Sequence, residues 1–370
     1  MMNRDFEDYD DEYRLDYQRQ VRREQRRRKL MDEKRARQLR VKKIKRIIAS
    51  VAALAVITTT AAVSVYMTKN DDTQSSVSPK ETLEVAADIN NSAADRKQAV
   101  YPAVSASYAE IEDEEVKSPY IALLDVENNS LIAGRSSDQL IYPASMTKVM
   151  TLIVAVENIA DMNSTYTMSA EMISYLVSQE ASRAGFNPGE TVSFNDLLYG
   201  LILPSGADSA VALSEMVGGT EEQFAQLMNK KCEELGLKNT HFVNASGLFD
   251  ENQYTTPLEM AMIMKYAMSN ELCAKVLSTY QYTTAPTEQH PEGILLTSTM
   301  FSRMYGTEVE GVTISAGKTG YTDEAKCCLV SYAEKDGHHY IAVTAAADYK
   351  WHVIFDDFEI YRNYLPQLPA

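Results

Sequence analysis

The chain has 370 residues, of which 45% are apolar and 24% charged, so it can bury a sizeable core and is not a disordered protein. Its net charge of −16 conceals an asymmetry, because residues 1–46 carry 17 Lys and Arg against 10 Asp and Glu. Residues 47–370 carry 19 Lys and Arg against 42 Asp and Glu. A basic head on an acidic body indicates that the two parts face different surroundings.

Residues 47–67, IIASVAALAVITTTAAVSVYM, form an uncharged stretch directly after a basic cluster. It is long enough to cross a hydrocarbon core of about 30 Å as a helix. The positive-inside rule then predicts a single-pass membrane protein with residues 1–46 in the cytoplasm and the rest outside it. A cleaved signal peptide, cut near Ala62-Val63-Ser64, is the alternative.

The run Arg26–Lys29 is dense enough to suggest a nucleic-acid-binding arm. Basic residues just inside a membrane are, however, expected from topology and from attraction to anionic lipid. No interleaved aromatic residues or binding motif accompany them, so we expect no nucleic-acid partner.

Residues 68–118 are rich in Ser, Asp, Asn, Glu and Lys and lack a sustained hydrophobic period. Such composition predicts a flexible extracytoplasmic stalk. The folded domain is then expected over residues 119–370.

Within this domain the pattern predicts a hairpin first, helices next and strands last. Apolar runs at 120–126 and 131–134 flank Asn128-Asn129, which predicts two paired strands. Residues 145–159 are apolar nearly all round, as in a buried helix. Further helices are expected at 194–203, 208–217, 221–235, 257–268 and 355–364, and further strands at 312–316, 327–334 and 339–346. This order predicts an α+β fold with an antiparallel sheet completed by both chain ends and flanked by helices.

The four cysteines, Cys232, Cys273, Cys327 and Cys328, fall in the exported part, where disulfides can form. None has zinc-ligand spacing, and no metal or other cofactor is expected. Cys327 and Cys328 would point to opposite faces of a strand, which favours separate packing residues over a pair. The sequence leaves the disulfide connectivity open.

Ser145-Met146-Thr147-Lys148 opens the expected buried helix, and its spacing puts the Ser hydroxyl and the Lys amine on one helical face. A serine hydroxyl needs a neighbouring base, and a desolvated lysine near a second cation can supply a neutral amine. The helix N-terminus offers N–H groups suited to an oxyanion. Taken alone, the motif also fits a capping serine and a surface lysine.

Two later segments carry further polar groups. GLILPSGADS places Ser205 at a turn between two helical runs, and alone it is an ordinary loop. SAGKTGYT ends a strand with Lys318, Thr319 and Gly320. The cation and the hydroxyl can hold a substrate carboxylate, while the glycine lets a peptide backbone approach closely. Alone, this segment also fits an edge strand protected by lysine.

Together and in this order, the three motifs resemble those of serine acyltransferases that process D-Ala-D-Ala and react with β-lactams. The similarity extends over residues 120–365 and includes YPASMTKVMT, the PGE at 188–190, DLLYGLILPSGAD, THFVNASGL and GKTGYTDEA. On these segments the chain resembles the low-molecular-mass penicillin-binding proteins, the serine D-alanyl-D-alanine carboxypeptidase family.

The resemblance implies a β-lactamase/transpeptidase-like fold and a hydrolase that removes the terminal D-Ala from peptidoglycan stem peptides. It also implies covalent inhibition by β-lactams. Ser145 would be the nucleophile, Lys148 its general base and Ser205 a proton relay. The implied substrate-binding residues are Lys318, Thr319, Gly320 and Tyr321. The backbone N–H groups of Ser145 and Tyr321 would form the oxyanion hole.

Two positions depart from the family pattern. Ala207 stands where the second motif usually ends in Asn, and Lys326 lies near a position that is commonly Gly. The first departure bears on rate or substrate positioning, so a catalytically reduced wall-binding protein of the same fold is one alternative. The second is expected to be a solvent-side change.

Other hydrolase classes fit the sequence less well. A β-lactamase is a further alternative, although no motif for a deacylating Glu is present. A His-based serine hydrolase would need a G-x-S-x-G nucleophile elbow, and a zinc peptidase would need a His, Asp and Glu ligand cluster. The sequence has neither.

Overall fold

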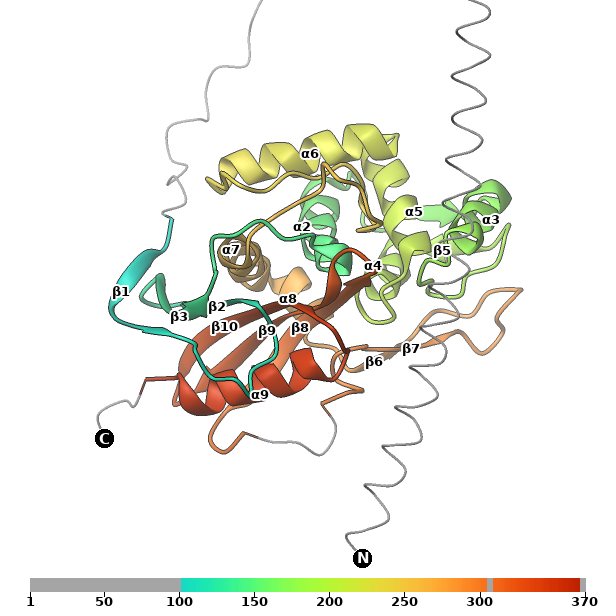
Figure 1. Ribbon diagram of the computed structural model, residues 1–370. Coiled ribbons are helices and arrows are strands. Elements are labelled where there is room, and N and C mark those ends of the chain that lie inside the picture. Colours follow the sequence, from blue (N-terminus) through green and yellow to red (C-terminus); the bar gives the residue numbers. More distant parts are fainter. Residues whose placement is uncertain (1–100, 305–308, 367–370) are drawn as a thin grey trace, which may run out of the picture. The chain divides into compact units, whose positions relative to one another are not determined.

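The computed structural model describes residues 101–304 and 309–366 (Figure 1). They belong to one compact unit, Asp95–Ala370. The predicted cytoplasmic head, the predicted span at 47–67 and the stalk up to residue 100 lie outside the described residues. Among the helices that are described, none is long and apolar enough to cross a membrane.

A six-stranded sheet with strand order β1-β3-β2-β10-β9-β8 forms the centre of the domain. Its strands are β1 Ala103–Glu110, β2 Tyr120–Asp125, β3 Ser130–Arg135, β8 Thr313–Thr322, β9 Lys326–Lys335 and β10 His338–Ala347. β2 pairs with β3 as the predicted hairpin, and β10 pairs with β2 antiparallel. The expectation that both ends of the domain complete one sheet is therefore confirmed.

Strand β1 corrects two expectations. It pairs with β3 in parallel, so the sheet is mixed and only five of its strands run antiparallel. It also lies inside the predicted stalk, so the folded domain begins well before residue 119. The sequence has no alternating apolar pattern for this strand, because its side chains are mostly exposed. The strand is attached to the sheet through backbone hydrogen bonds.

The segment after β1 is also part of the fold. Ile111 and Val116 are almost fully buried. The Arg135 guanidinium donates hydrogen bonds of 2.7 to 2.9 Å to four backbone carbonyls of this segment, those of Ile111, Asp113, Val116 and Ser118. A single arginine thus holds residues that the sequence assigned to a flexible stalk.

The predicted helices are present with small changes at their ends. They are α2 Thr147–Asn158, α4 Phe194–Ile202, α5 Ala207–Gly218, α6 Glu221–Glu234, α7 Pro257–Met268 and α9 His352–Asn363. Several start at a side-chain cap; Thr256 Oγ1, for example, accepts a hydrogen bond of 3.1 Å from the Glu259 N–H, and Pro257 occupies the first turn. α9 covers one face of the sheet, whereas α2 and α7 lie on the other (Figure 1).

Smaller elements were not predicted. They are the 3-10 turn η1 Ala144–Met146, helices α3 Ala170–Ser178 and α8 Glu271–Leu277, and the pairs β4 Thr165–Thr167 with β5 Thr191–Ser193 and β6 Gln281–Thr283 with β7 Leu295–Thr297. Each is short, so its hydrophobic period carries little signal.

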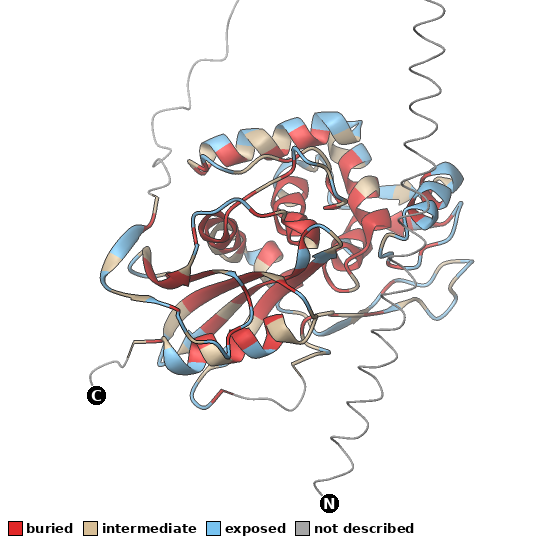
Figure 2. Cartoon of the chain, viewed as in Figure 1, coloured by how far each residue is buried: buried red, intermediate tan, exposed pale blue. Residues whose placement is uncertain are grey.

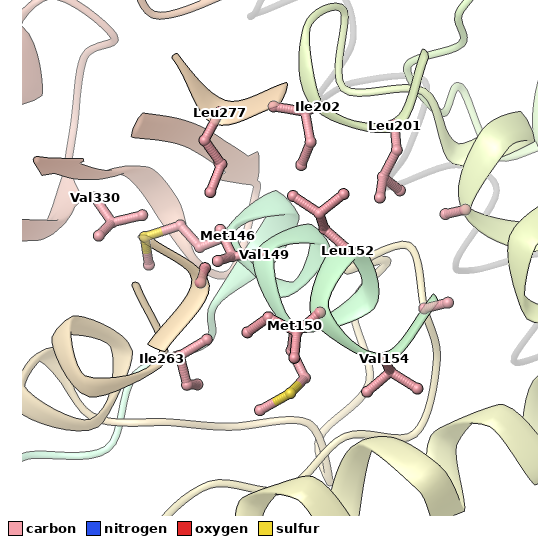
Figure 3. Packing of buried hydrophobic residues seen from close by; sticks show 14 of the residues in the cluster. Met146, Val149, Met150, Leu152, Val154, Leu201, Ile202, Ile263, Leu277 and Val330 are labelled. Carbon is pink, nitrogen blue, oxygen red and sulfur yellow. The ribbon is translucent and has the colours of Figure 1, made fainter. Parts of the chain in front are cut away.

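Helix α2 runs through the centre of the larger core. All residues from Thr147 to Ala155 are buried, which confirms the expectation of an interior helix. Figure 3 shows side chains from α2 meeting Leu201 and Ile202 of α4, Ile263 of α7 and Val330 of β9. Buried residues gather in the central strands and in the helix faces turned toward them, while α6 keeps an exposed outer face (Figure 2). The element that carries Lys148 is therefore held from all sides.

All four cysteines are buried and unpaired. Cys327 and Cys328 belong to the cores on opposite faces of β9, as their alternation in a strand predicts. Burial raises the pKa of the Cys328 thiol to about 12 and that of Cys327 to about 11. They are packing residues, as expected.

Candidate active site

Ser145 lies in the turn η1, immediately before α2, and not in the α-helix itself. The Lys148 side chain points back toward this turn, and its Nζ lies 3.0 Å from Ser145 Oγ. The predicted spacing therefore brings the hydroxyl and the amine into hydrogen-bond contact. This is the geometry that a serine nucleophile and its base require.

Lys148 is buried, with only 1% of its surface exposed. Burial lowers the pKa of its amine to about 7, an effect that the carboxylate of Asp208 partly opposes. The same amine donates a short hydrogen bond to the Ser246 carbonyl. A substantial fraction of Lys148 is therefore neutral near neutral pH, and a neutral amine can accept the Ser145 proton.

The loop Asn244–Gly247 lies against the turn that carries Ser145. Asn244 Oδ1 accepts hydrogen bonds from the N–H groups of Ser246, at 3.2 Å, and Gly247, at 2.8 Å. Gly247 has φ +79°, and a Cβ at this position would lie 2.0 Å from the Ala144 carbonyl oxygen. Only glycine fits here, because the loop touches the turn that carries Ser145. This segment contributes to the family resemblance, but no role for its residues follows from the sequence.

Ser205 and Lys318 form a second polar pair. Ser205 stands at the turn between α4 and α5 with φ +65°, and its Oγ accepts a hydrogen bond of 2.9 Å from Lys318 Nζ. The Lys318 amine also donates to the Thr319 carbonyl at 2.7 Å. Burial lowers the pKa of Lys318 well below its ordinary value, and the positive charges of Lys148 and Arg303 lower it further.

Strand β8 forms one edge of the sheet and passes close to Ser145. A Cβ at Gly320 would lie 3.0 Å from the Pro143 carbonyl oxygen and 3.2 Å from the Ser145 nitrogen. The glycine therefore lets β8 approach the Ser145 turn, which adds a structural reason for its presence. Tyr321 follows with 45% of its side chain exposed.

Ala207, which stands where the family usually has Asn, is buried beside the loop that contains Ser182. Its N–H donates a hydrogen bond of 2.7 Å to the Ser182 carbonyl, and its methyl group is 2% exposed. Asp208 binds the same loop, with Oδ1 accepting from Ala184 N at 2.8 Å and Oδ2 from Gly185 N at 3.2 Å. Lys326, the other departure, is exposed at the first position of β9, as a solvent-side change would be.

The predicted site residues therefore meet at one place although they come from separate parts of the chain. η1 and α2 supply Ser145 and Lys148, the α4–α5 turn supplies Ser205, and β8 supplies Lys318, Thr319, Gly320 and Tyr321. Sequence reasoning missed the supporting residues Asn244, Ser246, Gly247 and Asp208. It also missed Thr299, whose hydroxyl shares a hydrogen bond of 2.7 Å with the hydroxyl of Thr319. Asn244, Ser246, Gly247 and Asp208 lie in segments that resemble the family, but their contacts depend on the fold and could not be predicted from the sequence.

Residues 106–348 match the model of the peptidase S11 family, described as D-alanyl-D-alanine carboxypeptidase. The chain belongs to this family. The matched region contains all three motifs and every predicted site residue, so the resemblance noted in the sequence is confirmed.

Individual relatives agree with the family assignment. The chain is 32% identical over 225 residues to D-alanyl-D-alanine carboxypeptidase DacF of Bacillus subtilis, and this match covers 61% of the chain and 56% of the relative. It is 30% identical over 220 residues to the D-alanyl-D-alanine carboxypeptidase of Streptomyces sp. strain K15, covering 58% and 75%. The chain thus spans little more than half the length of the Bacillus protein.

A solved structure has the same fold. The crystal structure of the Streptomyces K15 DD-transpeptidase superposes with a TM-score of 0.60 at 28% identity, covering 67% of this chain and 97% of that chain. The expectation of a transpeptidase-like fold, with a sheet flanked by helices, is therefore confirmed for the catalytic region.

Proposed function

We propose that the chain is a serine-type D-alanyl-D-alanine carboxypeptidase, which removes the terminal D-Ala from peptidoglycan stem peptides through an acyl-enzyme. The observation that carries the proposal is the 3.0 Å contact between Lys148 Nζ and Ser145 Oγ, made by a buried amine whose pKa is lowered to about 7. An activated serine of this kind, in a chain of this family, supports acyl transfer.

Substrate binding would use β8, an edge strand of the sheet. A peptide lying along this edge would place its C-terminal carboxylate at Lys318 and Thr319. The carboxylate would favour the charged form of Lys318, which burial otherwise disfavours. A charged Lys318 would in turn keep Lys148 neutral, because two neighbouring cations repel. Substrate binding would thus leave Lys148 neutral and able to act as the base.

In acylation, Lys148 would take the Ser145 hydroxyl proton while Oγ bonds to the carbonyl carbon of the penultimate D-Ala. The backbone N–H groups of Ser145 and Tyr321 would stabilise the oxyanion. The C–N bond to the terminal D-Ala would then break, and its nitrogen would receive the proton from Lys148 through Ser205. Water would hydrolyse the acyl-enzyme, with Lys148 as base again, and return Ser145 to its hydroxyl form.

A direct assay tests the activity. Diacetyl-Lys-D-Ala-D-Ala is incubated with the wild type and with Ser145→Ala, and released D-Ala is measured. We expect release by the wild type alone. Glycine added as an acceptor amine separates hydrolysis from transpeptidation, because transfer would yield a glycine-extended peptide in place of the free acid. Equal release by both proteins would overturn the proposal.

We also infer that residues 47–67 anchor the protein, with the head in the cytoplasm and residues 68–100 as an extracytoplasmic tether. The charge asymmetry and the uncharged apolar stretch support this topology. Protease added to intact cells should release a fragment that begins between about residues 68 and 100. A soluble exported form that starts near Ser64 would instead indicate signal cleavage.

A further inference from the structure

The loop Asn244–Gly247 is bonded to helix α2 through two consecutive backbone carbonyls. The Thr151 hydroxyl donates a hydrogen bond of 2.7 Å to the Ala245 carbonyl, and the Lys148 amine donates to the Ser246 carbonyl. A backbone carbonyl from a distant part of the chain therefore contacts the amine that is the predicted base.

The Asn244 side chain folds this loop. Its Oδ1 accepts hydrogen bonds from the N–H groups of Ser246, at 3.2 Å, and Gly247, at 2.8 Å, and from the Ser246 hydroxyl at 3.2 Å. Its Nδ2 donates to the Leu248 carbonyl at 2.9 Å. An asparagine side chain that bonds the backbone two residues ahead turns the chain, so the amide determines where the carbonyls of the loop point.

The bond to Gly247 bears directly on the base. The Ser246 carbonyl and the Gly247 N–H belong to one planar trans peptide group, in which they point in opposite directions. The N–H is bonded to Asn244 and the carbonyl to Lys148. The peptide group is therefore held at both ends, and the bond at its N–H strengthens the carbonyl as an acceptor.

Other side chains hold the beginning of the loop. Gln253 Oε1 accepts a hydrogen bond of 3.0 Å from the Asn244 N–H, and Glu221 Oε1 accepts one of 3.1 Å from the Ala245 N–H. In the part of the chain that the structure describes, it is Asn244 that binds the Gly247 N–H. The carbonyl that meets the base thus depends on this one carboxamide.

We propose that Asn244 is a positioning residue for the general base. Through the Gly247 N–H it fixes the carbonyl that holds the Lys148 amine, and so keeps this amine at the nucleophile. The inference rests on the proposed function. Without the carboxamide the carbonyl can turn away, which gives the lysine side chain more freedom and removes an acceptor that favours its ammonium form.

The charged groups around Lys148 set the direction of the expected pH effects. Burial lowers the pKa of its amine, and the carboxylate of Asp208 on α5 opposes this. Lys318 on β8 brings a second amine, and Glu221 on α6 is bonded to the backbone of the loop. Loss of the carbonyl contact should lower the pKa of Lys148 further, whereas a new carboxylate at position 244 should raise it.

The test measures the rate of penicillin acylation between pH 5.5 and 9 in the wild type, Asn244→Ala, Asn244→Asp and the control Asn229→Ala. Asn229 on α6 makes two hydrogen bonds of 2.8 Å with the backbone of Phe242, so it supports the same segment two residues before the loop. We expect Asn244→Ala to lower the maximal rate by about 10- to 100-fold and to move the midpoint of the pH profile down by about 0.5 to 1 unit.

Asn244→Asp keeps the acceptor atoms and adds a charge, so it should recover part of the rate and move the midpoint up. Asn229→Ala should keep the midpoint and stay within about 3-fold of the wild-type rate. The midpoint does not depend on how much of a variant is folded, so a purely structural defect would leave it in place. An unchanged midpoint in both Asn244 variants therefore overturns the inference.

A second measurement separates this inference from the proposed function. If penicillin does not acylate the wild type, the proposed function fails, and the titration of Lys148 is then followed directly by the carbon-13 resonance of its Cε, assigned through Lys148→Arg. The midpoint should still fall in Asn244→Ala and rise in Asn244→Asp. Equal midpoints in the wild type and both variants would show that Asn244 does not act on the lysine.

Discussion

Lys318 on β8 and Ser205 on the α4–α5 turn, 113 residues apart in the chain, are joined by a hydrogen bond of 2.9 Å. The pair places a second buried amine near Lys148, and the charge on Lys148 helps to lower the pKa of Lys318. Two such amines do not both carry a proton easily. The one that meets an anion is favoured as the cation, which leaves the other as a base.

The rate of acylation by penicillin should rise as the pH increases through about 7. The reactive form is the neutral amine of Lys148, whose pKa burial lowers to about 7, and the ammonium form present at lower pH has no lone pair to accept the Ser145 proton. Adduct formation is followed by intact mass between pH 5.5 and 9. A rate that is flat or falls over this range would contradict Lys148 as the base.

Lys148→Arg should slow acylation by at least about 100-fold, the lower range for general base catalysis. Arginine keeps the positive charge, but its pKa exceeds about 12 and it supplies no neutral nitrogen. The pH dependence near 7 should disappear together with the rate. Near-normal acylation by this variant would mean that Lys148 is not the base, and Ser205 and Lys318 would be the next candidates.

Penicillin should form one covalent adduct on Ser145, and Ser145→Ala should form none. A β-lactam presents a strained acyl group in place of the D-Ala-D-Ala amide. Ser107→Ala is the control, because Ser107 is an exposed serine on β1, at the other edge of the sheet. An adduct that persists in Ser145→Ala while Ser107→Ala behaves as the wild type would show that the nucleophile lies elsewhere.

Gly247→Ala should slow acylation by about 100-fold, since the new methyl group would press on the Ala144 carbonyl and displace the Ser145 turn. Gly337→Ala is a matched control. Gly337 has φ +76° against +79° for Gly247, yet nothing lies within 4 Å of its added Cβ. Alanine is strained at a positive φ, so both variants should have a free energy of unfolding lower by about 1–2 kcal/mol, measured by thermal unfolding. Only Gly247→Ala should lose acylation. Equal acylation by the two variants would argue against the contact.

Ala207→Asn should change the rate of D-Ala release by no more than about tenfold in either direction. An Asn could add one hydrogen bond to the substrate, worth about 0.5–1.5 kcal/mol, but the methyl group it replaces is already buried and the neighbouring loop must adjust. Release from diacetyl-Lys-D-Ala-D-Ala is compared for both forms. Strong release by Ala207→Asn and none by the wild type would mean that the native protein is a binding protein.

Local patterns were sufficient to predict part of this site. The pairing of Ser145 with Lys148 follows from a spacing of three residues beside a buried helix, and the hairpin and most helices follow from hydrophobic period. The contact of Ser205 with Lys318 was not predicted, because the two residues lie far apart in sequence; family resemblance assigned each of them to the site separately. Gly247 and Thr299 act on Ala144 and Thr319 through the fold, so neither could be found from its own neighbours.

The position of β1 has a practical consequence for engineering the protein. β1 and β8 are the two edges of the six-stranded sheet, and at about 4.8 Å per strand they stand roughly 24 Å apart. The first described residues, which lead into β1, therefore lie at the edge of the sheet farthest from β8. A probe or fusion partner attached directly at residue 101 would therefore be joined to the domain at the edge opposite the one on which a peptide is proposed to lie.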